Sequence, residues 1–161
     1  LVRACLERGI EVECLPGATA LIPALVISGL PADRFTFEGF LPVKKGRQTK
    51  LQEIAQSDRT VILYESPHRL LKTLTQLSEH ASLDTHVVAV RELTKLHEEA
   101  VRGSLAELIE HFTKQEPRGE FVLLIGRSST FETKTREPLA PPSLSSEDDP
   151  RKMKRSKKWN K

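Results

Sequence analysis

The sequence predicts an α/β fold with a mixed sheet. Along residues 1–126, segments with the hydrophobic pattern of strands alternate with segments of helical periodicity. Two predicted strands follow one another with no helix between them. Only residues 94–96 connect them, and so short a connection is typical of antiparallel neighbours. The 161 residues suffice for one domain with a sizeable core, with or without a tail.

Glycine and proline delimit the predicted elements in the first part of the chain. Residues 1–8 have one apolar face and are expected to form a helix that Gly9 ends. In residues 10–15, Ile, Val and Cys alternate with Glu, which is typical of a half-buried strand. After a turn at Pro16-Gly17, we expect an apolar helix, a strand, and a helix that follows a basic loop, at 19–29, 35–41 and 49–56.

A nearly continuous apolar run at Thr60–Tyr64 predicts a central strand that is covered on both faces. Ser66 and Pro67 then provide an N-cap and a first-turn proline for a helix with a stripe of leucines. Ser104 and Glu107 have the spacing of a capping box that opens a later helix. The other predicted strands lie at 85–93, 97–102 and 119–126.

The net charge of +3 comes from the C-terminal end of the chain. Residues 132–161 hold nine Lys or Arg against five Asp or Glu, whereas residues 1–131 carry a net charge of −1. Because few apolar residues there would offset the entropy of ordering, we expect 128–161 to form a disordered basic tail. Two interpretations stay open: a tail that binds RNA phosphates, with Trp159 stacking on a base, or one that only increases solubility.

Several types of functional site are not expected. The sequence contains no glycine-rich phosphate loop and no H-E-x-x-H, G-x-S-x-G or C-x-x-C motif. The five histidines lack ligand spacing, so we expect no metal site. Cys5 and Cys14 are expected to be reduced thiols in a cytosolic protein. Because no run of about 18 apolar residues occurs, a membrane-spanning helix is not expected either.

Polar residues follow three predicted strands at the ends where ligands bind in α/β sheets. They lie at 16–19, 65–69 and 91–95. Each segment also has an ordinary structural interpretation, with Thr19 and Ser66 as helix caps and with Arg69 and Glu92 as solvated charges. Three such ends converging on one crevice would form a pocket with a polar rim.

Six short motifs together resemble those of a known enzyme family. They are Leu15-Pro-Gly-Ala-Thr-Ala20, Gly29-Leu-Pro-Ala-Asp-Arg-Phe35, Phe37-Glu-Gly-Phe-Leu-Pro42, Tyr64-Glu-Ser-Pro-His-Arg-Leu70, Arg91-Glu-Leu-Thr-Lys95 and Gly119-Glu-Phe-Val-Leu-Leu-Ile125. In this order they are similar to the rRNA small-subunit methyltransferase I family of the tetrapyrrole methylase superfamily. The resemblance implies transfer of a methyl group from S-adenosylmethionine to a cytidine 2′-hydroxyl of 16S rRNA in the small ribosomal subunit.

The resemblance also implies a place for this chain within a two-domain fold. Superfamily members have two α/β domains with the cofactor in the cleft between them, and they are commonly homodimers. Residues 1–15 are then expected to end the first domain, 16–127 to form the second domain and 128–161 to form the tail. The glycine-rich loop and a Ser-Asp-x-Gly-x-Pro segment of the first domain would precede Leu1. A cytoplasmic location follows from the implied ribosomal substrate.

Cofactor-binding residues are implied by the motifs at the three strand ends and at the start of the last strand. The expected residues are Pro16, Gly17, Thr19, Ala20, Tyr64, Glu65, Glu92, Leu93, Glu120 and Phe121. Glu65 and Glu92 are also candidates for a catalytic base, because a ribose hydroxyl is a poor nucleophile. The alternative is that Glu65 caps the following helix and that Glu92 pairs with Arg91.

RNA-binding candidates come from two groups of basic residues. Arg69, Arg91 and Lys95 follow strands, and Lys44, Lys45 and Arg47 lie with Lys50 on the basic loop. The loop is equally typical of a plain surface loop. Two other functions remain open: methylation of a small tetrapyrrole, and a non-catalytic RNA-binding or dimerisation module.

Overall fold

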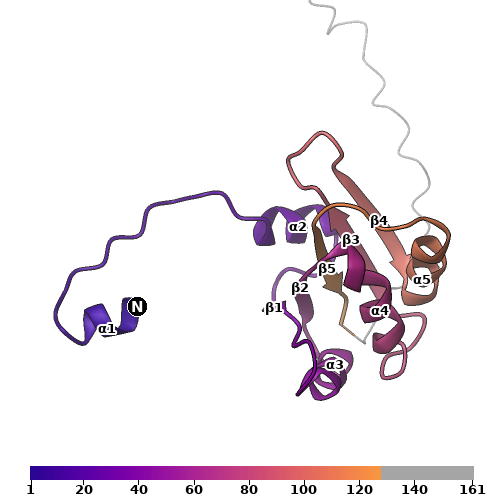
Figure 1. Cartoon of the computed structure of the whole chain (residues 1–161), viewed down its shortest axis with the longest axis horizontal. Coiled ribbons are helices and arrows are strands. Elements are labelled where there is room, and N and C mark those ends of the chain that lie inside the picture. Colours follow the sequence, from indigo (N-terminus) through magenta and orange to yellow (C-terminus); the bar gives the residue numbers. More distant parts are fainter. Residues whose placement is uncertain (128–161) are drawn as a thin grey trace, which may run out of the picture. The chain divides into compact units, whose positions relative to one another are not determined.

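Five strands form one mixed sheet in the computed structural model, which describes residues 1–127 (Figure 1). Across the sheet the order is β1 (Phe35–Phe40), β2 (Thr60–Glu65), β5 (Phe121–Ile125), β3 (His86–Arg91) and β4 (Glu99–Ser104). Strand β1 is parallel to β2, whereas β5 is antiparallel to both β2 and β3, and β3 is antiparallel to β4. The predicted α/β fold with a mixed sheet is confirmed.

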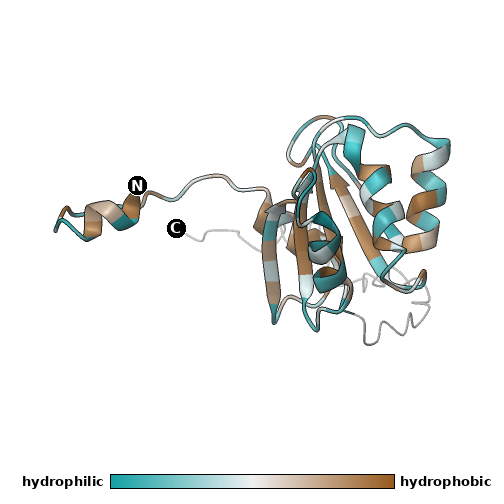
Figure 2. Ribbon diagram, turned by 60° about the horizontal axis from the view of Figure 1, so that its bottom comes forward, coloured by the Kyte–Doolittle hydropathy of each residue, from teal (hydrophilic) through white to brown (hydrophobic). Residues whose placement is uncertain are grey.

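Helices cover both faces of the sheet. One face packs against α3 (Arg47–Ala55), α4 (Pro67–Leu77) and α5 (Leu105–Lys114), and the other packs against α2 (Leu21–Ser28). Residues of β2 alternate between the two cores: Leu63 packs on the side of the three helices, and Ile62 packs on the side of α2. In Figure 2 the central strands are mostly hydrophobic, whereas α3, α4 and α5 carry both kinds of residue, as expected for a sheet covered on both sides.

The helix boundaries follow the signals in the sequence closely. Gly29 ends α2 in the left-handed conformation, with φ of 73°. The predicted capping box opens α5: Ser104 Oγ accepts the Glu107 N–H, and the Glu107 carboxylate accepts the Ser104 N–H. At α4, Ser66 is the N-cap and Pro67 the first helical residue, as predicted, but the Ser66 side chain makes no capping hydrogen bond and the Glu65 carboxylate accepts the Ser66 N–H.

The start of the chain contains the one predicted strand that is wrong. Helix α1 (Val2–Leu6) forms where a helix was expected, but residues 10–15 are not a strand. Ile10, Val12 and Leu15 are exposed to 53%, 40% and 77%. An alternating pattern forms a strand only when a neighbour supplies hydrogen bonds and an apolar face, and no strand among residues 1–127 pairs with this segment.

The predicted tail lies outside the described residues, so its disorder and the boundary at 127 stay predictions. The domain boundary at 15 also stays a prediction. Within residues 1–127, no helix has the length and apolar character that crossing a membrane requires.

Candidate functional site

A pocket of about 390 Å³ lies where β2 and β3 end and β5 begins. Both β2 and β3 are antiparallel to β5, so they are parallel to each other, and their carboxyl ends meet at this edge of the sheet. The lining residues are Ala20, Phe40, Tyr64, Glu65, Ser66, Pro67, Val90, Glu92, Leu93, Lys95, Glu120, Phe121 and Val122. Such a crevice is where α/β sheets bind ligands, and its volume suits a small molecule.

Most of the residues expected at a cofactor site line this pocket. Those brought together are Ala20, Tyr64, Glu65, Glu92, Leu93, Glu120 and Phe121. Pro16, Gly17 and Thr19 are exposed and are not among the lining residues. Of the Pro-Gly loop, only its last residue, Ala20, lines the pocket among the described residues, because the segment before α2 is exposed.

Sequence reasoning missed several residues of the pocket wall. Val90 and Val122 lie inside strands, and only the pairing of β3 with β5 shows that they face the same crevice. Phe40 ends β1 and, like Phe37, makes an edge-to-face contact with Tyr64, with ring centroids 5.7 and 4.9 Å apart. The pocket therefore combines an apolar and aromatic wall with a few polar groups at its rim.

The rim at the end of β3 is built around the Glu92 carboxylate. Glu92 Oε1 accepts the backbone N–H of Glu120 at 2.9 Å and a hydrogen bond from Lys95 Nζ at 3.2 Å. The Glu92 N–H in turn donates to the Glu120 carbonyl at 3.0 Å. The Glu120 N–H, followed by Lys95, lowers the pKa of Glu92 below its usual value. The structure therefore uses this carboxylate to extend the pairing of β3 with β5.

Backbone conformations at this rim are unusual. Glu92 and Thr94 have φ of 48° and 63°, in the left-handed region that non-glycine residues seldom adopt. Gly119 has φ of 84°, and a Cβ built there would lie 2.6 Å from Glu92 Cγ. Position 119 therefore needs glycine both for its conformation and for the close approach of Glu92. Such strain is common where a backbone is held for a ligand.

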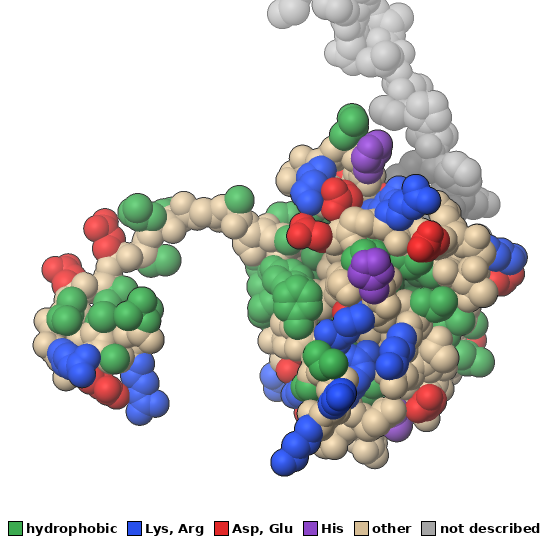
Figure 3. Space-filling view, in the orientation of Figure 1, with side chains coloured by type: hydrophobic (Ala, Val, Ile, Leu, Met, Phe, Trp, Pro, Cys, Tyr) green, Lys and Arg blue, Asp and Glu red, His purple; other side chains and the backbone are tan. Residues whose placement is uncertain are grey.

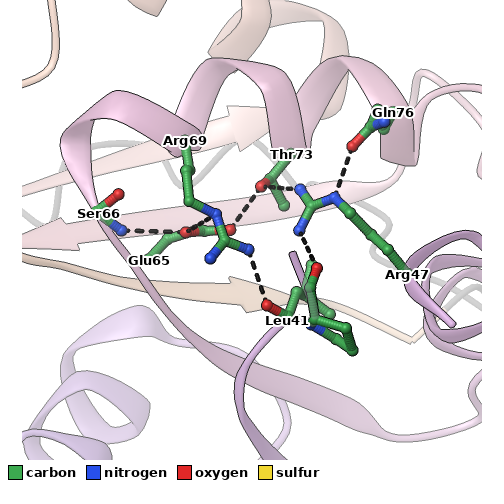
Figure 4. A network of polar contacts seen from close by, with 8 residues as sticks. Leu41, Arg47, Glu65, Ser66, Arg69, Thr73 and Gln76 are labelled. Atoms are coloured by element: carbon green, nitrogen blue, oxygen red, sulfur yellow. Dashed lines mark hydrogen bonds and ion pairs between the residues drawn. The ribbon is translucent and has the colours of Figure 1, made fainter. Parts of the chain in front are cut away.

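On the opposite rim, the Glu65 carboxylate is buried in a polar network (Figure 4), with a side-chain exposure of 0%. Glu65 Oε1 accepts a hydrogen bond of 2.6 Å from Thr73 Oγ1. Its Oε2 accepts the Ser66 N–H at 3.1 Å and lies 3.5 Å from Arg69 Nε. Three partners on α4 and its N-cap thus compensate the buried charge, which favours the helix-capping alternative for Glu65.

Arg47 completes this network from helix α3. Its guanidinium donates to Thr73 Oγ1 at 2.7 Å, to Gln76 Oε1 at 2.8 Å and to the Pro42 carbonyl at 3.3 Å. Burial, followed by the nearby Arg69, lowers the pKa of Arg47, whereas Glu65 raises it. The expectation that Arg47 lies on an exposed basic loop is wrong, because these partners bury it between α3 and α4. It instead connects both helices and the turn after β1.

The other basic candidates separate into paired and unpaired side chains. Arg91 Nε lies 2.8 Å from Glu99 Oε2, so Arg91 pairs with β4 rather than with Glu92. Lys95 bridges the Glu92 and Glu120 carboxylates at the pocket rim. Lys44 and Lys45 are exposed, and no ion pair within residues 1–127 includes them. Arg69 reaches the Leu41 carbonyl at 2.8 Å and keeps about a quarter of its side chain exposed.

No group of three or more His, Cys, Asp or Glu side chains in the described residues could hold a metal ion.

Comparison with known proteins identifies the family. Residues 1–109, which are more than half of the chain, match the family model described as tetrapyrrole (corrin/porphyrin) methylases. The chain belongs to the tetrapyrrole methylase family. The relatives that it resembles include the ribosomal RNA small subunit methyltransferase I of Synechocystis, 55% identical over 126 residues, and that of Thermotoga maritima, 43% identical over 125 residues. The two alignments each cover 78% of this chain, with 45% and 56% of the respective relative. The chain thus spans about half the length of the curated relatives that it matches.

Solved structures share the fold of this chain. A cobalt precorrin-4 methyltransferase superposes with a TM-score of 0.58 at 21% identity, covering 78% of this chain and 56% of that protein. A uroporphyrin-III C-methyltransferase from Thermus thermophilus, in complex with S-adenosylhomocysteine, gives a TM-score of 0.53 at 23% identity over 78% and 57% of the two chains. These likenesses show the shared fold.

Proposed function

We propose that this protein takes part in the S-adenosylmethionine-dependent 2′-O-methylation of a cytidine ribose in 16S rRNA. The observation that carries the proposal is the pocket at the ends of β2 and β3, which gathers seven of the ten residues that the family motifs imply for cofactor binding. Relatives at 43–55% identity are small-subunit rRNA methyltransferases, and a protein of the same fold binds S-adenosylhomocysteine.

The composition of the pocket fits this cofactor. Apolar side chains from β3 and β5 offer a slot for a flat base. The partly free carboxylate of Glu120, which is 87% exposed, suits a cationic ligand. The bound sulfonium would supply an already activated methyl group. Pro16, Gly17, Thr19 and Ala20 are proposed to complete the site when their segment is ordered against a ligand.

In this proposal the chain acts mainly by orientation. Holding a methyl donor in line with a hydroxyl removes much of the entropic barrier, so a strong base is not required. The Glu65 carboxylate has three partners within the fold, and Glu92 accepts two hydrogen bonds that lower its pKa. We therefore assign both glutamates to shaping the pocket, in preference to the base that their positions also suggested.

The test is methylation of small ribosomal subunits that lack the modification, in the presence of S-adenosylmethionine. We expect 2′-O-methylcytidine on nucleoside analysis of the RNA. Glu65→Gln and Glu92→Gln are expected to raise the KM for S-adenosylmethionine more than they lower kcat. A loss of kcat of about a thousandfold at unchanged KM would instead assign a base. RNA binding with no methyl transfer would favour the non-catalytic module, and transfer to a tetrapyrrole would favour the other methylase activity.

We also propose that the protein works as a homodimer in the cytoplasm, where its ribosomal substrate would be. The exposed apolar side chains on α2 and β1 support an interface: Val26 and Phe40 are exposed to 73% and 65%. Figure 3 shows hydrophobic side chains gathered on the side of the sheet domain where these elements lie. Analytical ultracentrifugation tests this proposal, and a single monomeric species at micromolar concentration would contradict it.

A further inference from the structure

Basic side chains gather beside the pocket, on a surface formed by the turn after β1 and by helix α4. Lys44, Lys45, His68 and Lys72 are all exposed there. Figure 3 shows Lys and Arg side chains clustered on this part of the molecule, in front of β1, α3 and α4. We call these four residues the basic surface.

The basic surface is connected to the pocket by the chain itself. Phe40 lines the pocket, and Lys44 and Lys45 follow it by only four and five residues. Pro67 also lines the pocket, and His68 is the next residue on α4, with Lys72 one turn further along the same exposed face. A long anionic ligand lying across the basic surface would therefore reach the mouth of the pocket.

A buried arginine, Arg47, and a partly buried one, Arg69, fix the turn after β1 against α4. Arg69 on α4 donates to the Leu41 carbonyl at 2.8 Å, and Arg47 donates to the Pro42 carbonyl while bonding to Thr73 and Gln76 of α4. His80 Nε2 and Gln48 Oε1, 3.2 Å apart, make a further contact between the ends of α4 and α3. The positions of Lys44 and Lys45 relative to α4 are thus set by the fold.

Among the described residues, no acidic side chain pairs with the lysines of this surface. Residues 41–52 and 66–78 contain no Asp or Glu. None of the ion pairs in residues 1–127 includes Lys44, Lys45 or Lys72, whereas Lys50 nearby pairs with Glu38 and Glu53. His68, Arg69 and Lys72 also lie in the first two turns of α4, which holds no acidic residue in its first turn. The Glu65 carboxylate caps this end of α4 and pairs with Arg69, so Lys72 is left without an acidic partner among residues 1–127.

We propose that the basic surface binds phosphate groups of the substrate RNA and leads the strand to the pocket. The proposal rests on the methyltransferase function proposed above, and it names the surface that receives the polymer. Arg47, Arg91 and Lys95 are not part of it, because their side chains are engaged with Thr73, Glu99 and Glu92, respectively. Each lysine that neutralises a phosphate releases a counterion, so binding weakens as salt rises.

The test compares two double variants of the full chain. Lys44→Gln/Lys72→Gln removes two charges from the basic surface. Arg34→Gln/Arg59→Gln removes two exposed charges at the other ends of β1 and β2, about 20 Å away along the strands. Both variants keep residues 128–161, so any contribution of those residues is the same in each.

Binding of a fluorescent single-stranded RNA fragment is measured by anisotropy between about 50 and 200 mM salt, without methyl donor. The basic-surface variant is expected to lose about 1.4 from the slope of log K against log[salt], because each single-strand phosphate contact contributes about 0.7. The control is expected to keep the wild-type slope. Equal slopes for both variants, or no RNA binding by the wild type, would overturn the proposal.

Three further outcomes distinguish this proposal from the alternatives. Equal loss of binding to vesicles of phosphatidylserine and to RNA would indicate a general anion surface and would also overturn it. If the basic-surface variant lost salt dependence of RNA binding but the wild type transferred no methyl group to RNA, the RNA-binding role of the basic surface would stand and the proposed function would be contradicted. Methyl transfer that is unaffected by Lys44→Gln/Lys72→Gln, including at high salt, would contradict the basic surface alone.

Discussion

Thr73 is the residue through which the stability of the buried network is best tested. Its hydroxyl accepts from Arg47 at 2.7 Å and donates to Glu65 at 2.6 Å. An arginine only donates and an ionised carboxylate only accepts, so one hydroxyl proton fixes the direction of both bonds. Thr73→Val replaces this hydroxyl with a methyl group of similar size. The buried Arg47 guanidinium and Glu65 carboxylate then each lose one hydrogen-bond partner.

The expected cost follows from the two lost bonds. A hydrogen bond to a charged group contributes about 1.5–3 kcal/mol, and Thr73 is fully buried, so water does not replace it without rearrangement. We expect Thr73→Val to lower the free energy of unfolding by about 3 kcal/mol. Arg47→Met should cost about 3–5 kcal/mol, because it leaves Glu65 with less compensation. In the double variant the costs should fall short of their sum, since both changes disrupt one network.

Urea unfolding followed by circular dichroism measures these differences. The matched control is Thr75→Val, two residues along α4, where an exposed hydroxyl bonds only to the Leu71 carbonyl of its own helix at 2.9 Å. Its expected effect is within about 0.5 kcal/mol. If Thr73→Val cost no more than Thr75→Val, the network would not hold the end of β2 against α4, and the reasoning would be refuted.

Three more outcomes follow from the pocket rim and the capping box. Gly119→Ala should destabilise the fold by about 2 kcal/mol more than Gly29→Ala, because both glycines have positive φ but only position 119 meets Glu92; equal urea midpoints would contradict the clash. The pKa of Glu92 is lower in the fold than in the unfolded chain, so its contribution is present above the ordinary Glu pKa of about 4.3 and is lost as the pH falls through the lowered value. Unfolding free energies measured from about pH 6 downward should therefore drop less steeply for Glu92→Gln than for the wild type, and parallel curves would argue against this linkage. Ser104→Ala should cost about 1 kcal/mol through the lost cap on the Glu107 N–H, and an unchanged midpoint would count against the capping box.

Local signals predicted the secondary structure well because most of them act over a few residues. Gly29 ends a helix in the left-handed conformation, and the Ser104–Glu107 pair closes a capping box, in each case as the residue types dictate. The prediction of a strand at 10–15 was wrong because an alternating pattern indicates only that one face of the segment prefers burial. Whether a partner strand exists is a property of the tertiary structure.

The candidate site divides in the same way. Tyr64, Glu65, Glu92 and Glu120 were predicted at the pocket from motifs at strand ends, and they line it. Their roles were not evident, because one carboxylate can cap a helix, pair with a lysine or act as a base. Arg47 shows the same ambiguity, since the sequence places it in a basic loop and its depth depends on where α3 packs against α4.

By itself, the sequence determined the α/β class, the order of the elements and the residues that the chain delivers to strand ends, because patterns of 2 and 3.6 residues and cap chemistry are local. Only the tertiary structure decided that β5 lies between β2 and β3, and thus which strand ends share one pocket. It also decided which charges are compensated and which stay free, as the pairing of a side chain depends on neighbours far away in the chain. Arg47 reaches Thr73 across 26 residues and is held inside, whereas Lys44 and Lys45 remain exposed.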